Sequence, residues 1–137
     1  MLSRMAPSRR HNQHPAEERQ RDRQQGDAVR AAALLAEGLA LQRELGDQHG
    51  VAECLEGLAG VVGVRGQPAR AALLFGAAEA LRDAIGAPVP PVDRADYERS
   101  VAAVRAQFDA AAFAVTWAEG RSTPLEQAIT VALSEGD

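Results

Sequence analysis

Lysine is absent from this chain, and all 15 of its strongly basic residues are arginine. Without a lysine amine, the chain can form neither a phosphate-binding P-loop nor a Schiff base. Cys54 is the single cysteine, which excludes a disulfide framework and favours a reducing, cytoplasmic setting. The chain has no run of about 18 apolar residues, and its N-terminus lacks the apolar segment of a secretory signal. We therefore expect no membrane span.

Aromatic side chains are also scarce, at 4% of a chain of 137 residues of which 46% are apolar. Alanine and leucine supply most of the apolar side chains, and both favour closely packed helices over sheets. A chain of this length has room for one domain with a modest core. The composition therefore predicts a single all-α domain.

Charge is distributed unevenly. Residues 1–25 contain six arginines and three acidic residues, a net charge of +3, so the rest of the chain carries −7 to give the total of −4. An acidic body argues against direct binding of nucleic acid. Residues 1–25 are also too polar to bury much surface, so we expect a disordered tail whose last part, from Pro15, could form a solvated helix.

An internal repeat with a period of about 40 residues follows the tail. One face of a helix predicted over 26–46 recurs 40 residues later. The first copy of this face comprises Leu34, Gly38, Leu41 and Leu45, and the second comprises Leu74, Ala78, Leu81 and Ile85. The glycines at both ends also match, Gly26 with Gly66 and Gly46 with Gly86. A repeat of this kind indicates stacked helical hairpins.

Apolar periodicity predicts the other helices. They cover residues 51–64, 68–85 and 93–108, and a last element in two parts, 109–119 and 123–135. In the helix over 51–64 and the turn after it, a glycine falls at every third position: Gly57, Gly60, Gly63 and Gly66. Each glycine inside a helix costs about 1 kcal/mol relative to alanine. This spacing therefore predicts a close approach between helices.

Capping residues mark where the later helices should begin. Asp93 is expected to cap the helix over 93–108. Asp109 is expected to cap the next helix, with Phe108 and Phe113 as a hydrophobic staple. Thr123, followed by proline and by glutamate three residues later, has the pattern of a capping box.

Part of the chain resembles the tetratricopeptide (TPR) motif. The first-helix pattern of the motif is met by Leu55, Leu58, Ala59 and Val62, and the second-helix pattern by Ala71, Phe75 and Ala78. Gly66 falls at the turn between them. We therefore expect residues 26–137 to form antiparallel helical hairpins stacked as a short TPR-like α-solenoid of about five helices.

A longer stretch, roughly residues 26–135, is similar to the C-terminal helical-repeat region of large bacterial LuxR-type and AfsR (SARP)-type transcriptional regulators and of related ATPases and cyclases. The segments GAAEALR, PVPP and WAEGR follow one another as they do where those regulators end. The resemblance implies a part in sensing or transmitting a signal in the cytoplasm through contacts with other protein domains. The nucleotide-binding, cyclase and DNA-binding domains of the family have no counterpart in this sequence.

The first copy of the repeat lacks its first helix. That helix should lie near residues 12–24, where the positions that ought to be apolar are Pro15, Glu18 and Asp22. We therefore expect the chain to start in the middle of a repeat and to leave one side of the helix over 26–46 uncovered.

The uncovered side provides the candidate binding surface. Its residues are expected to be Leu34, Leu35 and Leu39. Covering this face with a second copy of the chain would give a homodimer, so we take it as a candidate self-association face.

Few side chains could support catalysis or metal binding. His49 and Cys54 would lie about 140° apart on a helix, which does not suit a nucleophile–base pair. His11 and His14 are too few for a zinc site, which needs three or four ligands. We expect no catalytic residue, no cofactor and no metal site.

The remaining polar and aromatic candidates have structural explanations. Capping and solvent exposure account for Asp93, Asp96 and Glu98. Trp117, the single tryptophan, is expected to anchor the last turn of a helix that ends near Gly120.

The sequence thus predicts a non-catalytic protein-interaction scaffold, as the helical-repeat part of a transcriptional regulator. Two alternatives stay open. One is a stand-alone homodimeric TPR-like adaptor, and the other is a module that senses a small ligand or a peptide in the concave face of the solenoid.

Overall fold

The computed structural model describes residues 15–134, and within that range the chain forms six α-helices and no strand. The all-α prediction is confirmed. The helices are α2 (Pro15–Leu45), α3 (Gln48–Val64), α4 (Pro68–Ile85), α5 (Pro91–Arg105), α6 (Ala110–Ser122) and α7 (Leu125–Leu133). The two parts of the last predicted element, 109–119 and 123–135, are separate helices, α6 and α7.

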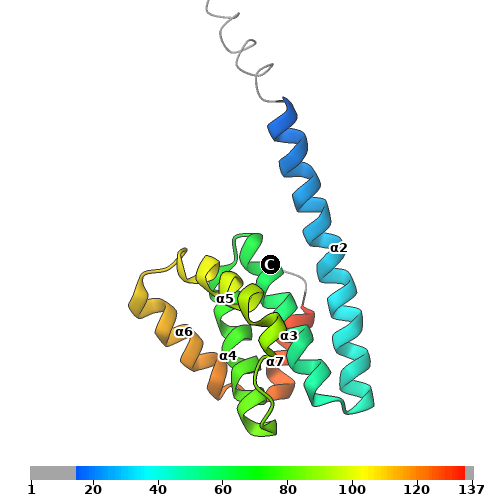
Figure 1. The fold of residues 1–137 in the computed structure, drawn as a ribbon, viewed down its shortest axis with the longest axis vertical. Helices are drawn as coiled ribbons and strands as arrows, with labels where there is room; N and C mark the ends of the chain where they lie inside the picture. Colours follow the sequence, from blue (N-terminus) through cyan, green and yellow to red (C-terminus); the bar gives the residue numbers. More distant parts are fainter. Residues whose placement is uncertain (1–14, 135–137) are drawn as a thin grey trace, which may run out of the picture.

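Helix α2 begins at Pro15 and not at the predicted residue 26, so the last part of the predicted polar tail is helical. Residues 1–14 lie outside the described part of the chain. Residues 15–25 are arginine, glutamine, glutamate, alanine and aspartate apart from Pro15, and most of these are good helix formers. Glu17 and Glu18 lie in the first turn, where negative charge favours the helix dipole. The N-terminal half of α2 extends beyond the other helices (Figure 1).

Helix α4 lies at the centre of the domain. It packs most extensively against α3 and α6 and also contacts α5 and α7, while α2 packs against α3 (Figure 1). Helices α5 and α6 are joined by a short turn but make few contacts with each other, because α6 packs directly on α4. The core contains the buried side chains of Leu39, Leu55, Leu74, Phe75 and Ile129.

Two of the four regularly spaced glycines, Gly57 and Gly63, lie close to another helix as the spacing predicted, whereas a Cβ on Gly60 would make an ordinary contact of 3.5 Å with Ser100 and one on Gly66 would meet nothing within 4 Å. A Cβ atom placed on Gly57 would lie 2.8 Å from Leu35 of α2. One placed on Gly63 would lie 2.7 Å from Val104 of α5. The approach of α6 to α4 is closer still, because a Cβ on Gly76 would lie 2.2 Å from a backbone oxygen, that of Trp117. Gly76 therefore limits the distance between the axes of α4 and α6, because its neighbour is backbone, whereas Gly57 and Gly63 face the ends of side chains.

Residues of the GAAEALR and WAEGR segments join α4 to α6. Glu79 accepts a hydrogen bond of 2.8 Å from the indole Nε1 of Trp117 and one of 2.7 Å from Arg121 Nη1. Arg121 also donates to Asp83 over 2.9 Å. The Trp117 ring stacks on Phe75, with ring centroids 5.9 Å apart. Trp117 is the anchor that was predicted, although α6 continues past Gly120 to Ser122.

Arg82 of α4 is the one buried charged residue among residues 15–134, and it pairs with Glu56 of α3. Its Nε and Nη2 atoms donate to the two carboxylate oxygens over 2.5 and 2.9 Å. Its Nη1 atom donates to the backbone oxygen of Ala87 over 3.0 Å. This side chain therefore connects two helices to the proline-rich linker that precedes α5.

Of the three predicted capping residues, one is correct. Asp109 caps α6 by accepting a hydrogen bond from the backbone N–H of Ala112, and Phe108 packs on Phe113 as the staple predicts. The cap at Asp93 is wrong, because α5 begins at Pro91 and places Asp93 in its first turn. The capping box at Thr123 is also wrong, because Pro124 occupies the N-cap position of α7 and Thr123 ends α6.

Candidate interaction surface

An exposed stripe of leucines runs along the C-terminal half of α2. Leu34, Leu41 and Leu45 have 68%, 53% and 69% of their surface exposed. They are spaced at i, i+7 and i+11, so they share one face of the helix over a length of about 16 Å. Isolated exposed leucines are common on protein surfaces, but a line of three on one helix face is a feature of interaction sites. We call these three residues the leucine stripe.

The predicted face of Leu34, Leu35 and Leu39 is only partly correct. Leu34 is exposed, as predicted. Leu39 is fully buried, so its assignment to an exposed face is wrong. Leu35 is half-buried and packs towards Gly57 of α3. The physical reason is that positions 35 and 39 lie about 100° and 140° around the helix from position 34, on the side that faces α3.

The leucine stripe corresponds to buried residues in the second copy of the repeat. Leu74 and Leu81, 40 residues after Leu34 and Leu41, are 0% and 7% exposed. The two copies share the same orientation, because Leu35 packs towards Gly57 and the equivalent Phe75 meets the equivalent Tyr97, with ring centroids 5.7 Å apart. Since α2 and α4 present the same face to the helix that follows each of them, the stripe is exposed within residues 15–134 because no other helix packs on that side of α2.

Within residues 15–134, α4 packs against the helix that precedes it, α3, whereas α2 has no preceding helix. Helix α3 packs along α4, with a Cβ placed on Gly63 lying 3.6 Å from Ala71. No helix within residues 15–134 occupies the equivalent place on α2, whose main contact is with the following helix, α3. The residues that would form such a helix are part of α2 itself.

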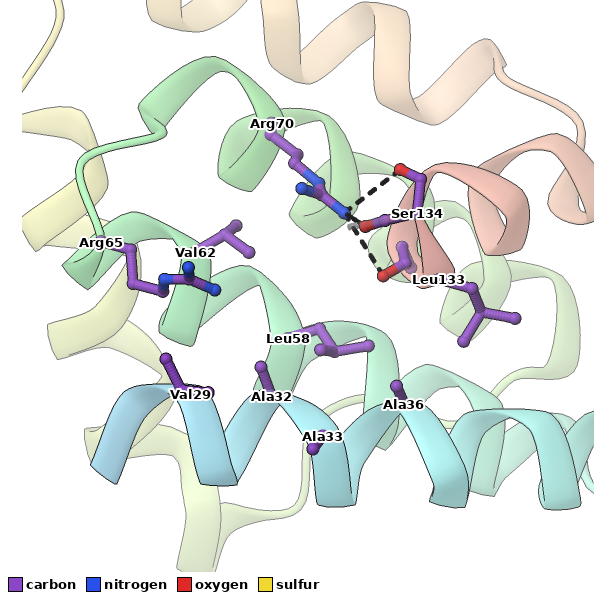
Figure 2. A pocket seen from close by; sticks show the side chains of 11 residues that line it. Val29, Ala32, Ala33, Ala36, Leu58, Val62, Arg65, Arg70, Leu133 and Ser134 are labelled. Atoms are coloured by element: carbon purple, nitrogen blue, oxygen red, sulfur yellow. Dashed lines mark hydrogen bonds between the residues drawn. The ribbon is translucent and has the colours of Figure 1, made fainter. Parts of the chain in front are cut away.

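A cleft of about 390 Å³ lies on another side of α2, between this helix and the end of α7 (Figure 2). Val29, Ala33 and Ala36 of α2 form one wall, and Leu58 and Val62 of α3 form the floor. Its charged lining residues are Arg65, near Val29, and Arg70, beside Ser134 (Figure 2). The cleft therefore combines apolar side chains with the polar and charged groups of Arg65, Arg70 and Ser134 in similar proportion.

Arg70 holds the end of α7 at this cleft (Figure 2). Its Nη2 atom donates to the backbone oxygens of Val131, over 2.8 Å, and of Ser134. Its Nη1 atom donates to Gln67 over 3.2 Å. Val131 also accepts from the backbone N–H and the hydroxyl of Ser134, so Arg70 adds a charged tertiary donor to carbonyl groups at the end of the helix. Arg70 thus acts as a tertiary cap for α7.

The side chains considered for chemistry do not converge in the structure. Cys54 is half-buried beside Gly38, and burial, followed by the charges of Glu53 and Asp47, raises the pKa of its thiol. A thiol that stays protonated at neutral pH is a weak nucleophile. His49 lies 3.8 Å from Glu53, and both side chains are about half exposed.

The carboxylates after the proline-rich linker are exposed on α5. Asp96 pairs with Arg99, and Glu98 lies 4.0 Å from Arg94. Across residues 15–134 no three histidine, cysteine, aspartate or glutamate side chains gather in a way that could hold a metal ion. His11 and His14 lie outside the described residues.

Comparison with protein-family models, with curated proteins and with solved structures gives no match to this chain. None of the helices within residues 15–134 combines the length and the apolar character that crossing a membrane requires.

Proposed function

We propose that this chain is a non-catalytic protein-interaction module that binds a helix of its partner along the leucine stripe. The observation that carries the proposal is the contrast between Leu34 and Leu74, which occupy equivalent repeat positions but are 68% and 0% exposed. A repeat position that is apolar in both copies and uncovered in one is a docking site for the missing neighbour.

The repeat architecture supports this interpretation over α2, α3 and α4. We interpret α3 and α4 as one hairpin of a TPR-like array and α2 as the second helix of the preceding hairpin. The equivalent contacts of Leu35 with α3 and of Phe75 with α5 agree with this register. Beyond α4 the array departs from regular stacking, because α6 packs extensively on α4 and makes few contacts with α5, so α5 and α6 do not form a packed hairpin.

The resemblance to LuxR-type and AfsR (SARP)-type regulators suggests a cellular role. In such a regulator this region would lie at the C-terminal end of a helical array in the cytoplasm and would transmit a signal through contacts between protein domains. The residues of the shared GAAEALR and WAEGR segments support a structural role for these motifs, because Glu79, Trp117 and Arg121 join α4 to α6.

Site-specific photo-crosslinking in the native cells tests the proposal. A photoreactive amino acid at Leu34 should give a discrete adduct, because this side chain lies at the proposed contact. The same amino acid at Val92, which is 86% exposed at the start of α5, is the matched control and should give none. Equal labelling from both positions, or no adduct from Leu34, would contradict the proposal.

The cleft beside α2 favours one alternative, a sensor for an amphipathic small molecule. Its volume of about 390 Å³ falls within the range of small-ligand sites, and Arg65 and Arg70 could receive a carboxylate while the alanine and leucine side chains contact an alkyl chain. Titration with dodecanoate is the test. Specific binding should be lost in Ala36→Phe, which fills the cleft, and retained in Val92→Phe.

A further inference from the structure

We infer that the partner helix on the leucine stripe is α2 of a second copy, so that two chains pair through antiparallel α2 helices about a two-fold axis. This inference rests on the proposed function and names its partner. Three features support it: the direction in which a helix on the stripe must run, the position of helices α3 to α7 relative to the stripe, and the charges beside the stripe.

The direction of the missing helix fits a two-fold pair. In the second copy of the repeat, α3 is joined to α4 by a short turn and packs along it, so the two helices run antiparallel. A helix that takes the place of α3 on α2 must therefore run antiparallel to α2. A two-fold axis perpendicular to α2 places a second α2 in this direction, and each stripe then covers the other in a self-complementary contact.

The rest of the domain does not obstruct this contact. Leu35 and Leu39 face α3, and Ala33 and Ala36 line the cleft or its edge on a further side of α2. The stripe borders the α3 side, where a Cβ atom placed on Gly38 would lie 3.4 Å from Cys54 of α3, and it lies away from the cleft. A second helix in this place would lie along α2 and beside the α3 of the first chain, as α3 and α5 lie beside each other on α4.

The charges beside the stripe favour one register. An antiparallel pair that sets Leu34 opposite Leu41 of the second copy also places Arg30 of each chain beside Glu44 of the other. These two positions lie on the same flank of the stripe, and in an antiparallel pair like flanks face each other. Glu37 lies on this flank between them and would meet its own counterpart near the axis. The interface thus contains two opposite-charge pairs and one like-charge pair.

Sedimentation of the full chain tests the inference. The wild type should associate reversibly to a dimer, and Leu34→Glu/Leu41→Glu should raise the dissociation constant about 100-fold or more, because two leucines per chain lose their apolar contact. Val92→Glu is the matched control and should leave the constant unchanged. Circular dichroism of each variant confirms that the helices are intact.

Charge reversal tests the register. Arg30→Glu places two like-charge pairs in the interface and should weaken the dimer about tenfold, and Arg30→Glu/Glu44→Arg should restore it. Glu37→Gln should strengthen the dimer, because it removes the repulsion near the axis. A dimer that is indifferent to the leucine changes, or one that the double charge reversal does not restore, would overturn the antiparallel pair.

The failure of this inference and that of the proposed function are distinguishable. A wild type that stays monomeric at every concentration overturns the second copy as partner. If Leu34 then crosslinks in cells to a species whose mass differs from that of a second 14.5 kDa chain, the interaction module stands with another partner. If Leu34 gives no adduct either, both proposals fail.

Discussion

Gly120 of α6 lies directly against the backbone of Leu73 on α4. A Cβ atom placed on Gly120 would come to 2.1 Å from the carbonyl oxygen of Leu73, a distance that no relaxation of a side chain could relieve. Gly76 makes the reciprocal approach from α4 to α6. The crossing of these two helices therefore depends on the absence of a side chain at both glycines.

Gly120→Ala should destabilise the fold by about 1–3 kcal/mol, because the added methyl group separates α6 from α4 and disturbs the packing of Trp117 on Phe75. Urea denaturation followed by tryptophan fluorescence measures this change, since Trp117 is the single tryptophan. The control is Gly26→Ala, where the new methyl group would meet nothing closer than 4.0 Å. It should not lower stability, and an equal loss in both variants would contradict the argument.

The buried pair of Arg82 and Glu56 yields a second prediction. Glu56→Leu should cost about 3–5 kcal/mol, because it leaves the guanidinium of Arg82 buried without its partner. Arg82→Met/Glu56→Leu should recover most of this loss, because no charge then stays buried. The free energies of unfolding of the three proteins test it, and a double variant as unstable as Glu56→Leu would show that the pair does not account for the loss.

These features show how far the sequence predicts the fold. The matching glycines identified the repeat, and Gly46 and Gly86 end α2 and α4 with φ values of 71° and 66°. Gly66, after α3, also has a positive φ. Its match Gly26 lies inside α2. The residues before Gly26 are good helix formers and have no apolar face with which to fold back, so the helix continues through the glycine.

The sequence predicted the candidate surface only in part. The sequence pattern places Leu34, Leu41 and Leu45 on one face. In the second copy of the repeat, however, the equivalent residues Leu74 and Leu81 are buried. Only the structure shows which neighbour is missing and therefore which side of α2 is exposed. Periodicity identifies residues that share a face, but it does not determine which of two apolar faces is covered, and so Leu39 was assigned to the wrong side.

The phenol of Tyr97 should lose its proton only at high pH. Burial, followed by the charges of Glu79 and Glu56, raises the pKa of its phenol from 10.0 to about 12. Because Tyr97 is the single tyrosine, the ultraviolet absorbance of phenolate measures its titration directly. In urea the unfolded chain should titrate near 10, and a value near 10 in the folded protein would contradict the prediction.

The same shift fixes the sign of a pH effect on stability. Below pH 10 the phenol is protonated in both states, so the stabilisation is fully present. As the pH rises from 10 to about 12, the unfolded state loses the proton and the folded state retains it, so stability falls through this window. Tyr97→Phe should remove this contribution, and the difference between the two denaturation curves at each pH measures it.

Arg70 should control the end of α7. Its guanidinium donates to backbone oxygens after the last turn of this helix, so Arg70→Ala leaves those carbonyl groups without a tertiary partner. Hydrogen bonds to a charged group contribute about 1.5–3 kcal/mol, so the local opening free energy of α7 should fall by a comparable amount. Hydrogen exchange of the amides of α7, whose side chain Ile129 is buried in the core, measures that free energy residue by residue.

The control for this prediction is Arg43→Ala. Arg43 of α2 also contacts α7, through Glu126 at 2.6 Å, but both side chains are about half exposed or more. An exposed pair contributes less than about 1 kcal/mol, so exchange in α7 should change little. If both variants accelerate exchange equally, α7 is held by charge in general. If only Arg70→Ala does so, the interhelical cap is what keeps α7 against α3 and α4 and maintains the cleft beside α2.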